Sequence, residues 1–220
     1  MLDRLVNIGE TIVYGVAFDP KNGERLKSMD LNELFASVGR LFDLLEEREA
    51  DYVLVGGIAM LAYVEGRNTQ DIDLILSRRD LARLPELVID DDNPDFARTM
   101  LGDLRVDVLF AEHKLFSAVA KNFSTPKVFA NRQVPCATEA GLLALKLFAL
   151  PSLYRQGRFA KVRIYENDVA ELIELMGEAP DSIYEVMAPT MMPSDLAEVR
   201  KIAEDISERL SKSKSRFSDE

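Results

Sequence analysis

The chain has 220 residues, of which 47% are hydrophobic, and its formal net charge is −11. This length suits one domain of good size, or a smaller domain with helical additions, around a sizeable core. The longest apolar runs fall far below the ~20 residues of a membrane span, and the N-terminus resembles no secretory signal. The single cysteine, Cys136, excludes an internal disulfide. We therefore expect a cytoplasmic protein with no membrane association.

Residues 1–28 have few structural signals. Apolar residues with near-helical spacing precede a turn-forming run at 18–23, so we expect a short helix and a loop that form an N-terminal extension. Residues 30–48 are clearer, because an apolar stripe at helical spacing follows Asp30, a plausible N-cap. This pattern predicts a helix that packs against a sheet, with its leucines in the core.

The stretch that follows carries the candidate chemistry. It predicts a buried strand at 52–55, a turn at Gly56-Gly57, a short helix, a polar loop and a second strand. Because side chains alternate along a strand, Asp71 and Asp73 project from the same face of this second strand. Two close carboxylates repel each other. Either one caps a neighbouring element and the other is solvated, or both bind a divalent cation, for which magnesium is the favoured choice.

The glycine turn offers a phosphate site. Glycine lets the backbone approach a ligand closely, and the helix that begins at Gly56-Gly57 directs N–H groups there. A Gly-Gly pair alone is a weak signal, because many tight strand-to-helix turns have one. Its combination with Asp71-Ile72-Asp73, which begins fourteen positions after Gly57, is much more specific.

A third acid follows on a later strand. Residues 96–101 and 104–110 predict two strands that are joined by a tight turn at 102–103. Asp107 lies between apolar neighbours on the second strand, so we expect it beside the first carboxylate pair in the shared sheet. The three consecutive aspartates at 90–92 fall in a predicted loop, and we interpret them as solvated.

These motifs together resemble the nucleotidyltransferase superfamily that includes DNA polymerase beta. Its signature is an apolar strand, Gly-Gly or Gly-Ser, a helix, Asp-x-Asp/Glu, and a third carboxylate on a later strand. The residues at 67–74 are similar to the bacterial abortive-infection toxin branch of the AbiEii/AbiGii type. The resemblance covers residues 30–175. The matching motifs are Val55-Gly56-Gly57, Asp71-Ile72-Asp73 and the Arg105–Phe110 segment that contains Asp107.

The resemblance implies an α+β (α/β) fold, with a mixed central sheet flanked by helices and a C-terminal helical part. The expected organisation is an extension at 1–28, a nucleotidyltransferase core at 29–137, a helical region at 138–210 and a flexible tail at 211–220.

The implied reaction is transfer of a nucleoside monophosphate from an NTP to an acceptor hydroxyl, with release of pyrophosphate. Two Mg²⁺ ions about 4 Å apart would serve it, with Mn²⁺ as a substitute. Asp71 and Asp73 would hold both ions, and Asp107 would complete one of them and help remove the acceptor proton. Gly56 and Gly57 would cradle the triphosphate. The further nucleotide-binding candidates are Arg67, Thr69 and Lys146.

The charge distribution allows two interpretations. Residues 113–165 contain nine basic residues and one acid, so this window carries +8 and the rest of the chain −19. Local potential steers a charged ligand more than the total charge does. The window is either a solvated basic face or an anionic substrate channel, and its start just after Asp107 favours the channel. We expect no catalytic role for His113.

Lys146 is unusual because it lies in the most apolar predicted helix, which begins after Thr138 and is expected to break at Pro151, before a basic and irregular segment at 154–165. Burial of an unpaired ammonium is costly, so Lys146 either extends outward or meets an anion. The resemblance makes it a nucleotide-phosphate candidate. Asp168 matches the last acid of a family pattern whose preceding acid is not clearly present. It either pairs with Lys146 or Arg155, or caps the next helix, and Asp168 and Arg155 are supporting candidates.

The acceptor stays open. The toxin branch implies RNA, such as a tRNA 3′ end, or a protein hydroxyl, together with a cognate antitoxin. One alternative is transfer to a small molecule such as an antibiotic, and another is a non-catalytic nucleotide-binding or interaction module. The enzyme assignment requires that Asp71, Asp73 and Asp107 converge and that none of them is turned to an arginine partner.

Overall fold

The computed structural model describes residues 6–65, 68–130 and 132–216. Within it the chain divides into two compact units, Met1–Ala137 and Thr138–Glu220. Every strand of the described residues lies in the first unit, and the second unit is helical. Among the described residues, no helix combines the length and apolar character that are needed to cross a membrane.

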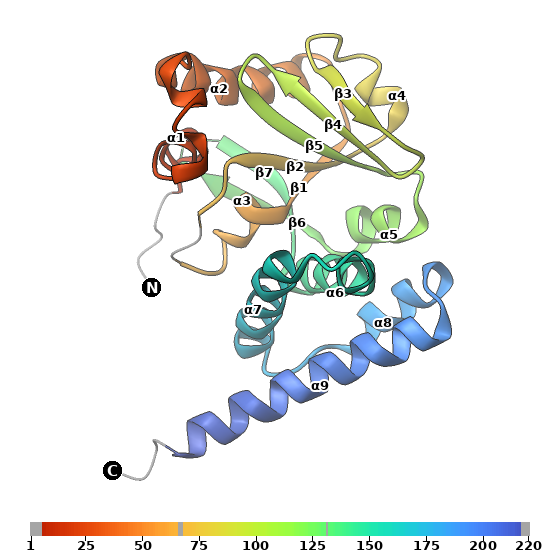
Figure 1. Cartoon of the computed structure of the whole chain (residues 1–220). Helices are drawn as coiled ribbons and strands as arrows, with labels where there is room; N and C mark the ends of the chain where they lie inside the picture. Colours follow the sequence, from red (N-terminus) through yellow and green to blue (C-terminus); the bar gives the residue numbers. More distant parts are fainter. Residues whose placement is uncertain (1–5, 66–67, 131, 217–220) are drawn as a thin grey trace. The chain divides into compact units, whose positions relative to one another are not determined.

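In its described part, the first unit is built around a seven-stranded sheet. The strands are β1 (Tyr52–Val55), β2 (Asp71–Leu76), β3 (Val88–Asp92), β4 (Phe96–Leu101), β5 (Leu104–Phe110), β6 (Ser124–Phe129) and β7 (Arg132–Ala137). Their spatial order is β3-β4-β5-β2-β1-β7-β6 (Figure 1). The β2–β5 and β1–β7 pairs are parallel, and the other neighbouring pairs are antiparallel. The mixed α/β fold with a mixed central sheet is therefore confirmed.

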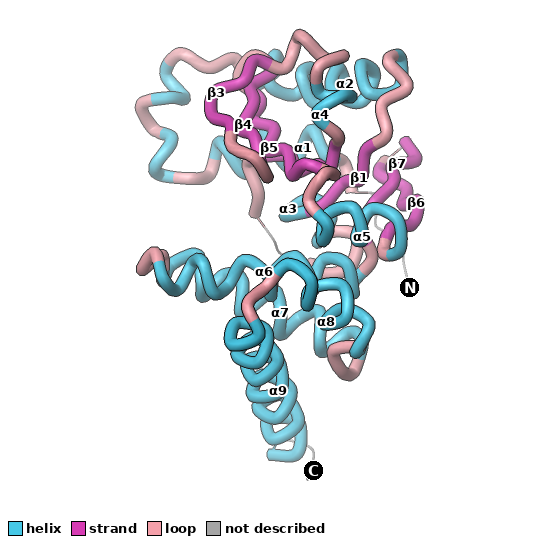
Figure 2. Tube along the Cα trace, turned by 90° about the vertical axis from the view of Figure 1, so that its right-hand side faces the viewer, coloured by secondary structure: helices cyan, strands magenta, loops and turns pink. Residues whose placement is uncertain are grey.

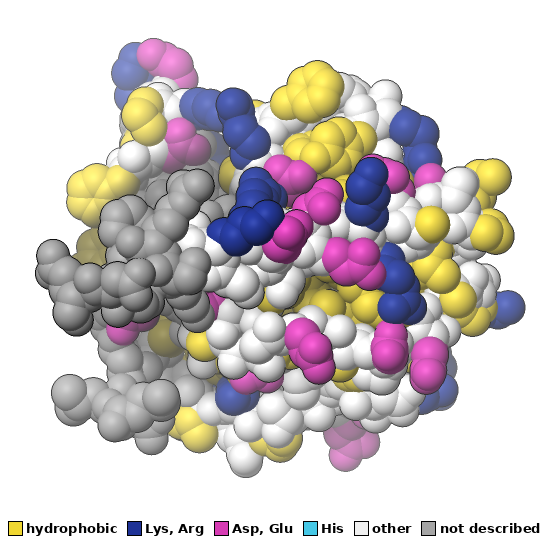
Figure 3. Space-filling model, turned by 90° about the horizontal axis from the view of Figure 1, so that it is seen from below, with side chains coloured by type: hydrophobic (Ala, Val, Ile, Leu, Met, Phe, Trp, Pro, Cys, Tyr) yellow, Lys and Arg dark blue, Asp and Glu magenta, His cyan; other side chains and the backbone are white. Residues whose placement is uncertain are grey.

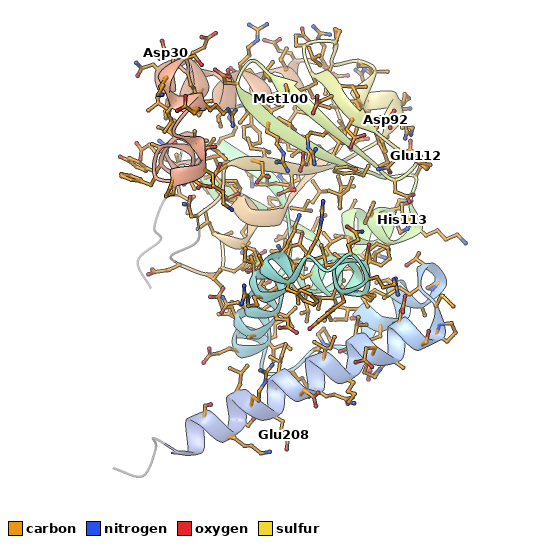
Figure 4. All side chains as sticks on the ribbon, in the orientation of Figure 1. Asp30, Asp92, Met100, Glu112, His113 and Glu208 are labelled. Carbon is orange, nitrogen blue, oxygen red and sulfur yellow. The ribbon has the colours of Figure 1, made fainter. Side chains whose placement is uncertain are left out.

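Helices surround this sheet. They are α1 (Ile8–Ala17), α2 (Leu31–Glu47), α3 (Gly56–Met60), α4 (Arg78–Leu81) and α5 (Lys114–Asn122), with two 3-10 helices at Pro20–Asn22 and Arg25–Lys27. Asp30 caps α2 as expected, because its carboxylate accepts hydrogen bonds from the backbone N–H groups of Asn32 and Glu33 (Figure 4). The short helix and loop expected within residues 1–28 are present as α1 and the segment after it.

The centre of the sheet is buried on both sides. Ile72 and residues 74–76 of β2 are at most 1% exposed. In Figures 1 and 2, α2 lies on one side of the strands and α3 and α5 lie on the other. A near-continuous apolar run is typical of a strand that is covered on both faces. The beginning of β2, with half-buried Asp71 and Asp73, is the part that departs from this pattern.

Residues 90–92 were expected in a loop, and this prediction is wrong. They form the second half of β3, an edge strand that pairs with β4 and whose five residues are all exposed. An edge strand needs no apolar side chain on either face when both faces meet solvent, so a run of aspartates is compatible with it. The prediction that these aspartates are solvated is confirmed.

The second unit contains α6 (Glu139–Arg155), α7 (Phe159–Met176), α8 (Asp181–Met187), a 3-10 helix (Ala188–Thr190) and α9 (Pro193–Arg216). The sequence suggests a helix break at Pro151 and an irregular segment at 154–165, and both suggestions are wrong. α6 continues through Pro151, and α7 already begins at Phe159. Proline removes one helical hydrogen bond, but buried Leu147, Leu150 and Leu153 keep this part of α6 packed. α9 continues beyond Leu210 to Arg216.

Candidate active site

The glycine corner between β1 and α3 is as tight as the sequence suggests. Gly56 has a φ of +67°, and a side chain there would overlap the carboxylate of Asp73. The backbone N–H of Gly57 donates to Oδ2 of Asp73 over 3.4 Å, and a side chain at Gly57 would overlap Thr69. Glycine is therefore required at both positions, and the group that approaches the corner is the Asp73 side chain.

The carboxylates converge through strand register. In the parallel β2–β5 pair, Asp71 is the register partner of Arg105, and Asp73 is the partner of Asp107. Asp73 is also the partner of Val55, the residue before the glycine corner. Neighbouring strands lie about 4.8 Å apart, so Asp73 and Asp107 are adjacent across the sheet. The predicted convergence of the three acids is thus present in the backbone.

The requirement that none of the acids turns to an arginine is not met. Arg105 donates from Nε to Oδ1 of Asp107 over 3.0 Å and from Nη2 to Oδ2 over 2.5 Å. The same Nη2 lies 3.1 Å from Oδ2 of Asp71. Arg105 and Asp107 are two positions apart on β5, so their side chains share a face. Arg105 was not predicted as a site residue, although the alternation of side chains at 105 and 107 is a signal for it.

A second arginine lies on the other side of Asp107. Arg98 of β4 is its register partner, and Nε of Arg98 lies 3.6 Å from Oδ1 of Asp107. Met100, two positions further along β4, pairs with Arg105 and marks this part of the sheet in Figure 4. Asp107 is 7% exposed, so its charge needs such partners. Hydrogen bonding to Asp107 raises the pKa of Arg105 further, which keeps the guanidinium charged.

Thr69 positions Asp71. The Thr69 hydroxyl donates to Oδ1 of Asp71 over 3.2 Å, and Thr69 is 7% exposed. A side chain at Gly15 of α1 would overlap the carbonyl oxygen of Thr69, so α1 packs directly against this loop. Thr69 was predicted to bind nucleotide, and its observed contact is with a carboxylate of the candidate site.

The N-terminal segment also holds the loop by hydrogen bonds. Gln70 donates to Oδ2 of Asp19 over 2.6 Å, and Asn22 donates to Oε1 of Gln70 over 2.9 Å and to the carbonyl of Val16 over 3.0 Å. The backbone N–H of Lys21, and then Gln70, lower the pKa of Asp19. The sequence contains no local signal for these hydrogen bonds, because Asp19 and Asn22 lie about fifty positions before Gln70.

The carboxylate oxygens of Asp73 and Asp107 are the kind of ligand that magnesium takes, and the strand register places them on adjacent strands. Magnesium is usually held by one or two carboxylates together with water and substrate phosphates. Asp73 and Asp107 on adjacent strands supply two carboxylates of this kind. In the described part of the chain, however, no three His, Cys, Asp or Glu side chains are grouped to hold a metal ion. The contacts of Arg105 with Asp71 and Asp107 would have to change for the ion to bind.

In the second unit, Lys146 meets an anion. Its Nζ lies 2.8 Å from Oδ2 of Asp168 and 4.1 Å from the centre of the Tyr165 ring. Lys146 and Asp168 are 5% and 0% exposed, so the lysine does not extend to solvent. Arg155 pairs instead with Asp195 over 3.0 Å. Of the pairings left open by the sequence, Lys146 with Asp168 is the one observed.

The remaining candidates contribute less. Arg67 lies outside the described residues. Within the basic window, Arg132 forms ion pairs with Asp43 and Glu46 of α2. Acidic and basic side chains are interspersed across the face of the described residues in Figure 3. His113 precedes α5, and its ring centroid lies 4.4 Å from that of Phe116.

Solved structures of low sequence identity are similar to the chain, and they include the following three. No protein-family model matches it, and no curated protein does. ANT(2″)-Ia in complex with adenylyl-2″-tobramycin is 14% identical over 64% of this chain and 95% of that chain, with a TM-score of 0.45. The solution structure of the antibiotic-resistance factor ANT(2″)-Ia is 14% identical over 86% and 100%, with a TM-score of 0.45. An antigenic nucleotidyltransferase-like protein from Paracoccidioides brasiliensis is 16% identical over 76% and 90%, with a TM-score of 0.44.

Proposed function

We propose that the chain is a nucleotidyltransferase, which transfers a nucleoside monophosphate from an NTP to an acceptor hydroxyl and releases pyrophosphate. One observation carries this proposal. Asp73 is the register partner of Asp107 across two parallel strands, and Asp73 also lies against a glycine corner that has no space for a side chain. Carboxylates that lie side by side on largely buried strands repel each other, which costs free energy. Binding of a cation, together with an anionic substrate, would offset this repulsion.

The residues divide into three tasks. Asp71, Asp73 and Asp107 together form what we call the carboxylate centre. Asp71 and Asp73 would hold magnesium, and Asp107 accepts the proton of the acceptor hydroxyl. Gly56 and Gly57 admit the triphosphate close to the backbone, and Thr69 holds Asp71 in place. Magnesium, when bound, offsets the negative charge that develops on the phosphates. Arg67 and Lys146, with Asp168 as the partner of Lys146, are the further nucleotide-binding candidates, and Arg155, which pairs with Asp195, is a supporting candidate.

The acceptor belongs to the same proposal. The similarity of residues 67–74 to the toxin branch supports RNA, such as a tRNA 3′ end, or a protein hydroxyl as acceptor, and a cytoplasmic toxin that is neutralised by an antitoxin. A small-molecule acceptor is the alternative within the same chemistry.

A second function is favoured by the arginine contacts. If Arg105 stays on Asp71 and Asp107, the carboxylates are already neutralised and the fold serves as a non-catalytic nucleotide-binding or interaction module. Arg105 is 37% exposed, however, and an exposed side chain rearranges far more readily than the backbone register that brings Asp73 and Asp107 together. The condition that no acid turns to an arginine is thus not met by the present side-chain positions, and we place the enzyme first because the arginine that occupies the acids can move away while the strand register stays.

A labelling experiment decides between these functions. The protein is incubated with Mg²⁺ and each NTP labelled at the α-phosphate, once with total RNA and once with an aminoglycoside as a small-molecule acceptor. Labelled RNA or labelled protein is the expected result. Asp73→Asn should abolish labelling, whereas Asp90→Asn on the exposed edge strand β3 is the matched control and should leave it unchanged. Nucleotide binding without transfer to RNA, protein or an aminoglycoside would favour the non-catalytic module.

A further inference from the structure

We propose that Arg105 is the built-in counter-cation of the carboxylate centre, and that a divalent cation binds this centre only in competition with the Arg105 guanidinium. The inference rests on the proposed function for the purpose of the cation. No role was predicted for Arg105 from the sequence. The inference is tested by measuring binding of the cation, without nucleotide transfer.

Arg105 occupies the oxygen atoms that a cation would need. Both oxygens of Asp107 accept a hydrogen bond from it, at 3.0 and 2.5 Å, and one oxygen of Asp71 lies 3.1 Å from the same guanidinium. Two parallel hydrogen bonds between a guanidinium and a carboxylate are stronger than bonds between neutral groups and fix the geometry of both partners. Each carboxylate oxygen has a second lone pair, but a metal ion that takes the positions held by the Arg105 guanidinium has to break at least one of these bonds.

The register explains why an arginine stands here. Asp71, Asp73 and Asp107 share one face of two adjacent parallel strands, so three negative charges lie close together. Asp107 is 7% exposed, and a buried carboxylate without a partner is costly. Arg105 lies opposite Asp71 and two positions before Asp107, which makes it the side chain that reaches both. Arg98, 3.6 Å from Asp107, adds a second positive charge.

The same geometry allows the guanidinium to leave. The side chain of Arg105 is 37% exposed, whereas that of Asp107 is 10% exposed. When a divalent cation provides the positive charge, the arginine can move into solvent while the carboxylates stay where the strands hold them. Cation binding is thus weaker than the three carboxylates alone would produce, because the cation first has to replace Arg105.

The experiment measures binding of Mn²⁺ alone to the whole chain by electron paramagnetic resonance, without nucleotide or RNA. Arg105→Gln removes the competing charge, and we expect its Mn²⁺ affinity to rise by about tenfold, which corresponds to the loss of one charged hydrogen bond. Thermal unfolding should show a lower melting temperature for this variant without Mn²⁺ and a larger increase on its addition. Arg40→Gln, at an exposed position of α2, is the matched control and should behave as the wild type.

A second variant keeps the test decisive in case Arg105→Gln does not fold. Arg105→Lys keeps the positive charge but loses the paired hydrogen bonds, so its affinity for Mn²⁺ should lie between those of the wild type and Arg105→Gln. If Arg105→Gln does not fold, Arg105→Lys decides. Mn²⁺ affinity that is equal to or weaker than that of the wild type, in whichever variant decides, overturns the inference.

The outcomes separate the inference from the proposed function. If the wild type transfers nucleotide but the variants bind Mn²⁺ no more tightly, the inference fails and the function stands. If Arg105→Gln binds Mn²⁺ more tightly and neither protein transfers nucleotide, the inference stands and the function fails. If Mn²⁺ binds to neither protein, the competition is overturned.

Discussion

Asp73 of β2 and Asp107 of β5 are register partners in a parallel strand pair, and Asp73 also faces Val55 of β1. The candidate site is therefore fixed by three adjacent strands of one sheet and not by a mobile loop. Its side chains can exchange partners, as Arg105 is proposed to do, while the backbone that places them stays the same.

Gly56→Ala should damage both the fold and the site. A φ of +67° is unfavourable for alanine by about 1–2 kcal/mol, and the new methyl group would also overlap the Asp73 carboxylate. We expect a loss of at least ~2 kcal/mol in the free energy of unfolding, measured by urea denaturation, and loss of nucleotidyl transfer. Gly39→Ala is the control, because this glycine lies within α2 with open space around it. It should stabilise the protein by about 1 kcal/mol, and an equal effect of the two substitutions would contradict the role of the corner.

Thr69→Val should slow transfer more than it unfolds the protein. It removes the hydroxyl that holds Oδ1 of Asp71, so we expect transfer to fall by about tenfold, or ~1.4 kcal/mol. Thr99→Val is the matched comparison, because the buried Thr99 hydroxyl donates to the carbonyl of Val106 and contacts no carboxylate oxygen in the described hydrogen bonds. Both variants should lose about 1 kcal/mol of stability. A slower rate in the Thr99 variant alone would argue against the positioning of Asp71.

Lys146→Met should strongly destabilise the protein, because it leaves the fully buried Asp168 carboxylate without its cation. Removal of one partner of a buried pair costs about 3–5 kcal/mol. The double variant Lys146→Met/Asp168→Leu should lose much less than the sum of the single substitutions, measured by urea denaturation. Arg155→Met breaks an exposed pair with Asp195 and should cost no more than about 1 kcal/mol. Additive losses in the double variant would show that the buried pair is not coupled.

The free energy of unfolding should fall at acidic pH, in part because of His113. Burial lowers the pKa of His113 in the folded protein below its usual 6.5, so the folded state favours the neutral ring. The unfolded chain then binds more protons than the folded one, and the contribution of His113 is complete above about pH 6.5 and is lost as the pH falls through the folded pKa. Urea denaturation at several values between pH 5 and 8 should show a steeper loss for the wild type than for His113→Gln. Parallel curves for the two proteins would exclude this contribution.

Much of the site could be predicted from short-range patterns. Alternation along a strand puts Asp71 and Asp73 on one face, and the turn at Gly102 brings the strand of Asp107 back along the sheet. The glycine corner and the Asp30 cap depend on neighbours within a few residues. Such features follow from local backbone geometry, which sequence periodicity describes well.

Other features depend on contacts between distant parts of the chain. Asp19 meets Gln70, and β3 becomes an edge strand because β4 is available to pair with it. α6 continues through Pro151 because tertiary packing outweighs one lost hydrogen bond. Local propensity contains no information about which distant partner is present, so these outcomes could not be predicted from it.

The placement of three carboxylates and a glycine corner on neighbouring strands of one sheet could be predicted from the sequence, because periodicity and turn chemistry act over a few residues. The contacts of Arg105 with two of these carboxylates and the pairing of Lys146 with Asp168 became visible only in the folded chain. Ion pairs depend on side-chain distances of a few ångströms across separate elements, and these distances exist only once the chain has folded.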